Sequence, residues 1–171
     1  MNPTPLQRAL SAAPERAPAA KPRAEQEFFS FELGGLRIGV PSENVREVLR
    51  AGPLTPLPRS PSFLLGVTGH RGEVLPVLDL LRFLGKGEAR IGSRTRLFVG
   101  ISGSYVAAVL ADTVAGLTRV PLSDIMPPPV GGDFSTDHLL GVVQPASGGQ
   151  IISLLNFSKV LQTARQRAVS R

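Results

Sequence analysis

Apolar and polar residues alternate along two stretches of the chain, and a short turn interrupts each alternation. The first stretch turns at Gly34-Gly35 and the second at Ser102-Gly103-Ser104. A period of two on both sides of such a turn predicts an antiparallel β-hairpin, because glycine accepts the positive φ that tight hairpin turns need. The apolar positions are Phe29, Phe31, Leu33, Ile38 and Val40 in the first hairpin and Leu97, Val99, Ile101, Val106, Ala108 and Leu110 in the second.

A second pattern also occurs twice. The sequence Leu-Leu-Gly-Val stands at residues 64–67 and again at 139–142, and each copy runs through a polar loop into an apolar segment, at 74–80 and 151–157. Two copies of one short unit indicate a duplicated architecture. The copies differ most in their loops, where function tends to reside.

Two stretches favour helices. Ser42 is a suitable N-cap for a short helix in which Val45, Val48 and Leu49 share one face, ending near Gly52. Near the C-terminus, Asn156 or Ser158 is a suitable cap for a second helix. Its apolar stripe consists of Val160, Leu161, Ala164 and Ala168.

Prolines at 3, 5, 14, 18 and 22 predict that residues 1–26 form a disordered Pro/Ala-rich tail outside the fold. No apolar run of signal-peptide length occurs near the N-terminus. The longest uncharged apolar segment, residues 97–111, is shorter than the ~20 residues that a membrane helix needs. We therefore expect a cytoplasmic protein without membrane insertion.

The net charge of +6 lies mostly at one end of the chain. Residues 28–158 carry eleven Lys/Arg against ten Asp/Glu, whereas residues 159–171 carry four Lys/Arg and no acidic residue. A nucleic-acid-binding domain concentrates basic groups on its folded surface, so the balanced body argues against nucleic acid as a partner. The C-terminal residues, 163–171, are predicted to be a basic tail.

Few residues suggest chemistry. The absence of cysteine excludes disulfides and thiol catalysis. The two histidines, His70 and His138, lack a third partner at metal-ligand spacing, so no metal or cofactor is expected. A small hydrolase using His70 or Asp112 is kept as a remote alternative, although the chain has no nucleophile elbow.

The loop at residues 68–73 is the most prominent candidate binding element. Gly66, Gly69 and Gly72 permit tight turns, and they present Arg71 as a strongly directional hydrogen-bond donor. We favour Arg71 as a binding anchor. The alternative is a structural arginine bonded to loop carbonyls.

These residues carry a family resemblance. The run Phe63-Leu64-Leu65-Gly66-Val67-Thr68-Gly69-His70-Arg71-Gly72, followed by Leu75-Pro76-Val77-Leu78-Asp79-Leu80, resembles the signature of CheW-type coupling proteins of bacterial chemosensory systems. The similarity covers about residues 27–162. Two departures are Gly69-His70, where Asn-Leu is usual in the family, and Asn156, where an aspartate is frequent.

The resemblance implies a mainly β protein with two SH3-like five-stranded β-barrel subdomains, built from intertwined halves at about 27–92 and 93–162. It also implies a non-enzymatic adaptor that joins the cytoplasmic tip of a chemoreceptor to the regulatory domain of a CheA-type histidine kinase. Carried over by position, the receptor-binding residues are Val45, Glu47, Gly66 and Arg71. The departures leave open a divergent adaptor that binds the receptor, or another pathway component, but not the kinase.

Overall fold

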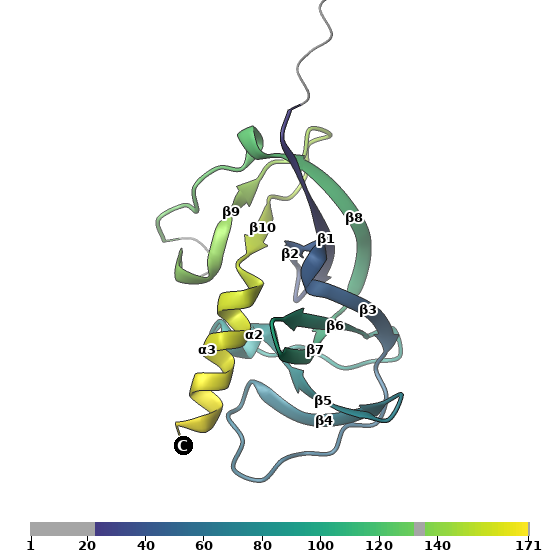
Figure 1. Ribbon diagram of the computed structural model, residues 1–171. Coiled ribbons are helices and arrows are strands. Elements are labelled where there is room, and N and C mark those ends of the chain that lie inside the picture. Colours follow the sequence, from purple (N-terminus) through teal and green to yellow (C-terminus); the bar gives the residue numbers. More distant parts are fainter. Residues whose placement is uncertain (1–22, 132–135, 171) are drawn as a thin grey trace, which may run out of the picture.

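The computed structural model describes residues 23–131 and 136–170, which form two five-stranded sheets and a C-terminal helix (Figure 1). The strands are β1 (Glu25–Leu33), β2 (Leu36–Pro41), β3 (Val45–Arg50), β4 (Leu64–His70), β5 (Glu73–Leu78), β6 (Arg96–Ser102), β7 (Tyr105–Ala111), β8 (Thr113–Pro121), β9 (Leu139–Val143) and β10 (Ile152–Leu155). The helical segments are the 3-10 turns η1 (Ser42–Asn44), η2 (Leu122–Asp124) and η3 (Thr136–His138) and the α-helices α2 (Leu80–Phe83) and α3 (Phe157–Val169).

Each sheet takes strands from both halves of the chain. Barrel A has the strand order β8-β1-β2-β10-β9, and barrel B has the order β3-β6-β7-β5-β4. The two predicted hairpins are confirmed as β1–β2 and β6–β7, which form the centres of barrels A and B. Because each hairpin recruits strands from the other half, neither half of the sequence folds into a barrel alone.

The duplication extends to the way in which each sheet closes. A two-way backbone hydrogen-bond pair joins Thr55 to Val67 in barrel B, and an equivalent pair joins Met126 to Val142 in barrel A. In both barrels the segment that follows the outer strand, β3 or β8, thus reaches the opposite edge of its sheet. This arrangement turns each five-stranded sheet into a barrel.

One core joins the barrels. Phe98 of barrel B is completely buried, and its ring centroid lies 5.4 Å from that of Phe29, 4.9 Å from that of Phe31 and 5.7 Å from that of Phe157. The first two rings belong to barrel A and the third begins α3, which starts at the lower end of barrel A and runs beside barrel B in Figure 1. Burial of these aromatic surfaces stabilises the barrels as a unit.

The prediction of a helix starting at Ser42 is wrong beyond the first turn. The chain makes only the 3-10 turn η1, in which Ser42 forms no side-chain cap, and then enters strand β3. Val45 and Val48 are β-branched and lose less side-chain freedom in a strand than in a helix. Pairing with β6 also satisfies the backbone of this segment, which outweighs the helical spacing of its apolar residues.

The predicted tail boundaries also need correction. Strand β1 begins at Glu25, so the segment 1–26 overlaps the fold, while residues 1–22 lie outside the described residues. Asn156, one of the two predicted caps, caps helix α3. The helix continues to Val169, so the predicted tail from residue 163 is mostly helical. Arg167 contributes to this continuation, because its guanidinium lies 4.8 Å from the Phe83 ring centroid.

Candidate functional site

The β4–β5 hairpin holds the predicted anchor Arg71 at its tip. His70 pairs with Glu73, which leaves Arg71 and Gly72 as a two-residue turn with φ angles of 47° and 80°. Two successive positive φ values match the right-handed twist of the flanking strands. The turn leaves the Arg71 side chain 76% exposed.

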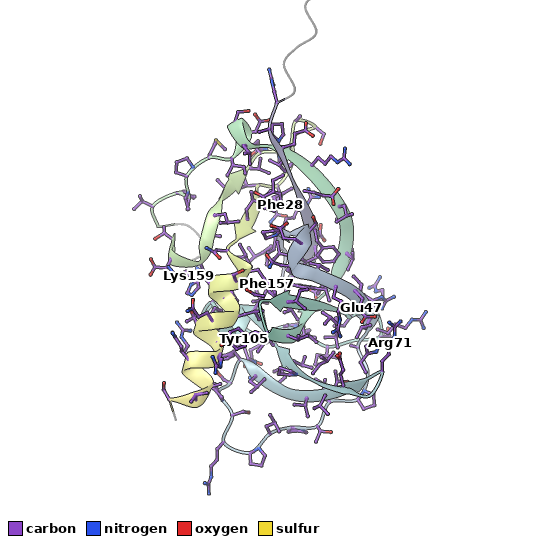
Figure 2. The ribbon with its side chains drawn as sticks, in the orientation of Figure 1. Phe28, Glu47, Arg71, Tyr105, Phe157 and Lys159 are labelled. Atoms are coloured by element: carbon purple, nitrogen blue, oxygen red, sulfur yellow. The ribbon has the colours of Figure 1, made fainter. Side chains whose placement is uncertain are left out.

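Glu47 of β3 joins this tip to the neighbouring strand. Its Oε2 lies 3.1 Å from Nε2 of His70 and 3.4 Å from a guanidinium nitrogen of Arg71. Figure 2 shows Glu47 and Arg71 together at one edge of the molecule, away from Lys159 on α3. The structure therefore brings two predicted site residues into contact and adds His70 between them.

A second ion pair ties the same elements together. Arg46 donates to the Glu73 carboxylate at 2.6 Å, and this hydrogen bond lowers the pKa of Glu73 and raises the pKa of Arg46. Arg46 is the bulged residue of β3, without a register partner in β6. The bulge turns its side chain toward β5, so charged contacts connect the outer strand of barrel B with the hairpin.

The other two predicted site residues are less accessible. Gly66 is buried with φ 144°, and a Cβ at this position would overlap the backbone carbonyl of Thr55. Its counterpart Gly141 meets the carbonyl of Met126 in the same way. The glycine thus permits the close backbone approach that closes the barrel, while Val45 is half-buried against the core.

Two exposed apolar residues that follow Glu47 and Glu73 in sequence were not predicted as site residues. Val74, next to Glu73, is 71% exposed, and Val48, next to Glu47, is 42% exposed. The strand alternation around buried Leu75 is a sequence signal that would have placed Val74 outside. The helical prediction instead put Val48 on a buried stripe.

The repeat places a third exposed apolar residue in a position equivalent to Val48. Val48 pairs with Phe98 across β3 and β6, and Leu117 pairs with Phe29 across β8 and β1. Because the Phe29 and Phe98 rings touch at the junction of the barrels, Val48 and Leu117 flank the same aromatic contact from opposite barrels. Leu117 is 63% exposed.

The two residues considered for hydrolysis are engaged in other contacts. The Asp112 carboxylate accepts a 2.8 Å hydrogen bond from the backbone N–H of Gly34, and His70 contacts Glu47. Each contact has a structural role: the first fastens a hairpin turn, and the second holds the β4–β5 tip. Residues 23–131 and 136–170 contain no group of three His, Asp or Glu side chains arranged to hold a metal ion.

His138 is a buried polar residue beneath α3. Its ring lies edge-on to Phe83 at 5.2 Å, and among the described residues its Nδ1 has no hydrogen-bond partner. Burial, followed by the nearby charges of Arg167 and Lys159, lowers the pKa of His138. The neutral imidazole is therefore the form that fits the folded protein.

This pKa direction predicts acid sensitivity. The unfolded chain takes up a proton on His138 near pH 6.5, whereas the folded protein resists it. The stability that the neutral ring contributes is thus present above about pH 6.5 and is lost as pH falls toward the lower folded pKa. Urea unfolding at pH 7.5 and pH 5.5 measures how much the free energy of unfolding falls between these two pH values. This decrease should be smaller for His138→Phe than for the wild type, and equal decreases would contradict the prediction.

Two barrels joined by one core present an exposed strand and hairpin with gathered charged contacts, an arrangement that suits a protein-interaction scaffold. The family model described as CheW-like domain matches residues 27–165, and the chain belongs to this family. CheW-family proteins are scaffolds of chemosensory systems and not enzymes, and this chain is such a scaffold.

Individual relatives agree with this assignment. Protein FrzA of Myxococcus xanthus is 74% identical over 159 residues, covering 93% of this chain and 99% of the relative. Chemotaxis protein CheW of Rhizobium meliloti (strain 1021) is 32% identical, with 84% and 92% covered. The crystal structure of scaffolding protein TtCheW from Thermoanaerobacter tengcongensis has the same fold, with a TM-score of 0.72, 21% identity, and 85% and 93% covered.

Within residues 23–131 and 136–170, every helix falls short of the length and hydropathy that a membrane span needs.

Proposed function

We propose that this chain couples the cytoplasmic tips of chemoreceptors to a CheA-type histidine kinase, and that the receptor docks on the outer strand and hairpin of barrel B. The supporting observation is the contact of Glu47 with both His70 and Arg71, which fixes the hairpin tip while leaving the Arg71 guanidinium open to a partner. A preformed site of this kind avoids part of the ordering cost of binding.

The chemistry of the surface suits a helical partner. Arg71 supplies a forked donor for a carboxylate or a carbonyl. Val48 and Val74, which follow Glu47 and Glu73 in their strands, add exposed apolar area on barrel B. Apolar anchors with one arginine at the edge are typical of grooves that receive an amphipathic helix. Gly66 and Val45 support this surface from below through barrel closure and core packing.

Replacing Arg71 by alanine should weaken the binding of a receptor cytoplasmic fragment by roughly tenfold, because a charge-assisted contact is lost. The fold should persist, since exposed ion pairs such as Arg71–Glu47 contribute about 1 kcal/mol or less. Titration calorimetry gives the affinity and urea unfolding gives the stability.

Arg59→Ala is the matched control. Arg59 is also an exposed arginine with positive φ, at 61°, but it lies in the loop between β3 and β4. Wild-type affinity in the Arg71→Ala variant, or an equal loss in Arg59→Ala, would argue against the proposed receptor site.

The divergent adaptor that engages the receptor but not the kinase is the second candidate. It is motivated by the unusual hairpin sequence, in which His70 contacts Glu47. Pull-down of the purified chain with the kinase regulatory domain separates the two: retention supports the two-sided scaffold, and its absence supports the receptor-only adaptor.

A further inference from the structure

Two arginines face each other at the end of the β3–β6 pair. Arg50 and Arg96 are direct register partners, which places their Cβ atoms about 5 Å apart on one face of the sheet. The Arg96 guanidinium is held by the carbonyls of Arg94 and Thr95, at 3.0 and 3.3 Å. Like charges in directly opposite positions destabilise a strand pair, so this arrangement costs stability in the isolated protein.

The repeat shows what the same position holds in the other barrel. Each outer strand has a one-residue bulge, at Arg46 in β3 and Ala115 in β8. The fourth residue after each bulge is an arginine, namely Arg50 or Arg119. In barrel A the register partner of Arg119 is Glu27, and the two form an ion pair at 3.6 Å.

In barrel A, the arginine at this position thus pairs with a carboxylate of the same chain, whereas in barrel B the residue opposite the arginine is a second arginine. Within residues 23–131 and 136–170, none of the ion pairs involves Arg50, Arg94 or Arg96. Three cationic side chains thus share one end of the β3–β6 pair without an anion from the described part of the chain.

We infer that the Arg50–Arg96 pair is completed by a carboxylate from an acidic segment of the docked receptor tip. The inference rests on the proposed function, because it extends the receptor surface along β3 from Arg46 to Arg50, a distance of about 13 Å. Two arginines in directly opposite positions suit a carboxylate, which accepts parallel hydrogen bonds from arginine. Along β3, Val48 lies between Arg46 and Arg50 and provides the apolar part of the same surface.

A protein carboxylate fits better than a phosphate-rich polymer or a membrane. Nucleic acids and anionic lipid surfaces select broad basic areas. Here residues 28–158 carry eleven basic against ten acidic side chains, and the unpaired arginines are local. A local cluster favours one carboxylate-bearing segment.

Arg50→Glu tests the inference, because it recreates in barrel B the opposite-charge pair of barrel A. We expect the affinity for a receptor cytoplasmic fragment in ~0.1 M salt to fall by roughly tenfold or more. We also expect this affinity to depend less on salt concentration than that of the wild type. We also expect the Tm to rise by about 1–3 °C, since repulsion becomes attraction. Arg50→Ala should give a smaller loss of affinity, and Arg59→Glu, which makes the same charge change elsewhere, should give none.

The outcomes separate the inference from the function on which it rests. Receptor binding by the wild type that Arg50→Glu leaves unchanged would overturn the inference and leave the proposed function standing. Failure of the wild type to bind the receptor fragment would contradict the proposed function itself, and with it the inference. Binding to vesicles of equal parts phosphatidylglycerol and phosphatidylcholine is measured in parallel. The inference would also be overturned if Arg50→Glu weakened binding to these vesicles and left the receptor affinity unaltered.

Discussion

Replacing Phe98 by alanine is expected to lower the free energy of unfolding by about 3–5 kcal/mol. The ring is fully buried and touches Phe29 and Phe31 from barrel A and Phe157 from α3. Its removal leaves a cavity at the junction, where the neighbours from β1 and α3 cannot all move inward together. Urea unfolding followed by circular dichroism measures the loss.

Phe28→Ala is the control for the loss of a buried aromatic ring within one barrel. Phe28 is equally buried, but it belongs to a smaller cluster inside barrel A, with Val120, Val143, Ile152 and Leu154. If Phe98 joins the barrels, only Phe98→Ala should separate the unfolding of the two barrels and reduce the steepness of the transition. A loss below about 1 kcal/mol for Phe98→Ala would show that the barrels do not depend on this contact.

Asp79→Ala should lower the free energy of unfolding by about 3 kcal/mol, because it removes a buried carboxylate with several hydrogen-bond partners. Asp79 accepts hydrogen bonds from the backbone N–H groups of Leu81, Arg82 and Ala89, and its Oδ2 lies 3.3 Å from Nε of Arg82. The variant leaves three donors without this acceptor. It should loosen helix α2 and the loop that follows.

Asn156 provides an internal comparison for Asp79. It occupies the corresponding position before α3, but among the described residues its side chain accepts only the backbone N–H of Lys159. Loss of this single cap should cost about 1 kcal/mol in Asn156→Ala. Thermal unfolding of both variants tests the difference, and equal losses would contradict a special role for the Asp79 carboxylate.

Much of the barrel architecture was predictable because its signals are local. The alternation around Gly34-Gly35 and around Gly103 predicts both central hairpins, and the repeated Leu-Leu-Gly-Val predicts the duplication to which β4 and β9 belong. Strand β3 was predicted as a helix because Val45, Val48 and Leu49 have helical spacing. Its strand conformation depends on pairing with β6, which is almost fifty residues further along the chain.

The candidate site was predictable only in part, for the same reason. A glycine-flanked turn predicts an exposed Arg71, and the structure has it exposed. The contacts of Glu47 with His70, and of Arg46 with Glu73, join positions more than twenty residues apart, so no local pattern shows them. The structural role of Gly66 follows from its approach to Thr55, which becomes visible only when the barrel closes.

The coupling of receptor state to kinase activity by this chain is the proposal on which the others rest. Its most direct test is kinase autophosphorylation in a mixture of receptor cytoplasmic fragment, CheA-type kinase and this protein, with each component also left out in turn. We expect kinase activity to respond to the receptor only when the wild-type chain is present, and we expect Arg71→Ala to weaken this response. A chain that binds the receptor fragment while kinase activity stays unchanged would contradict the claim.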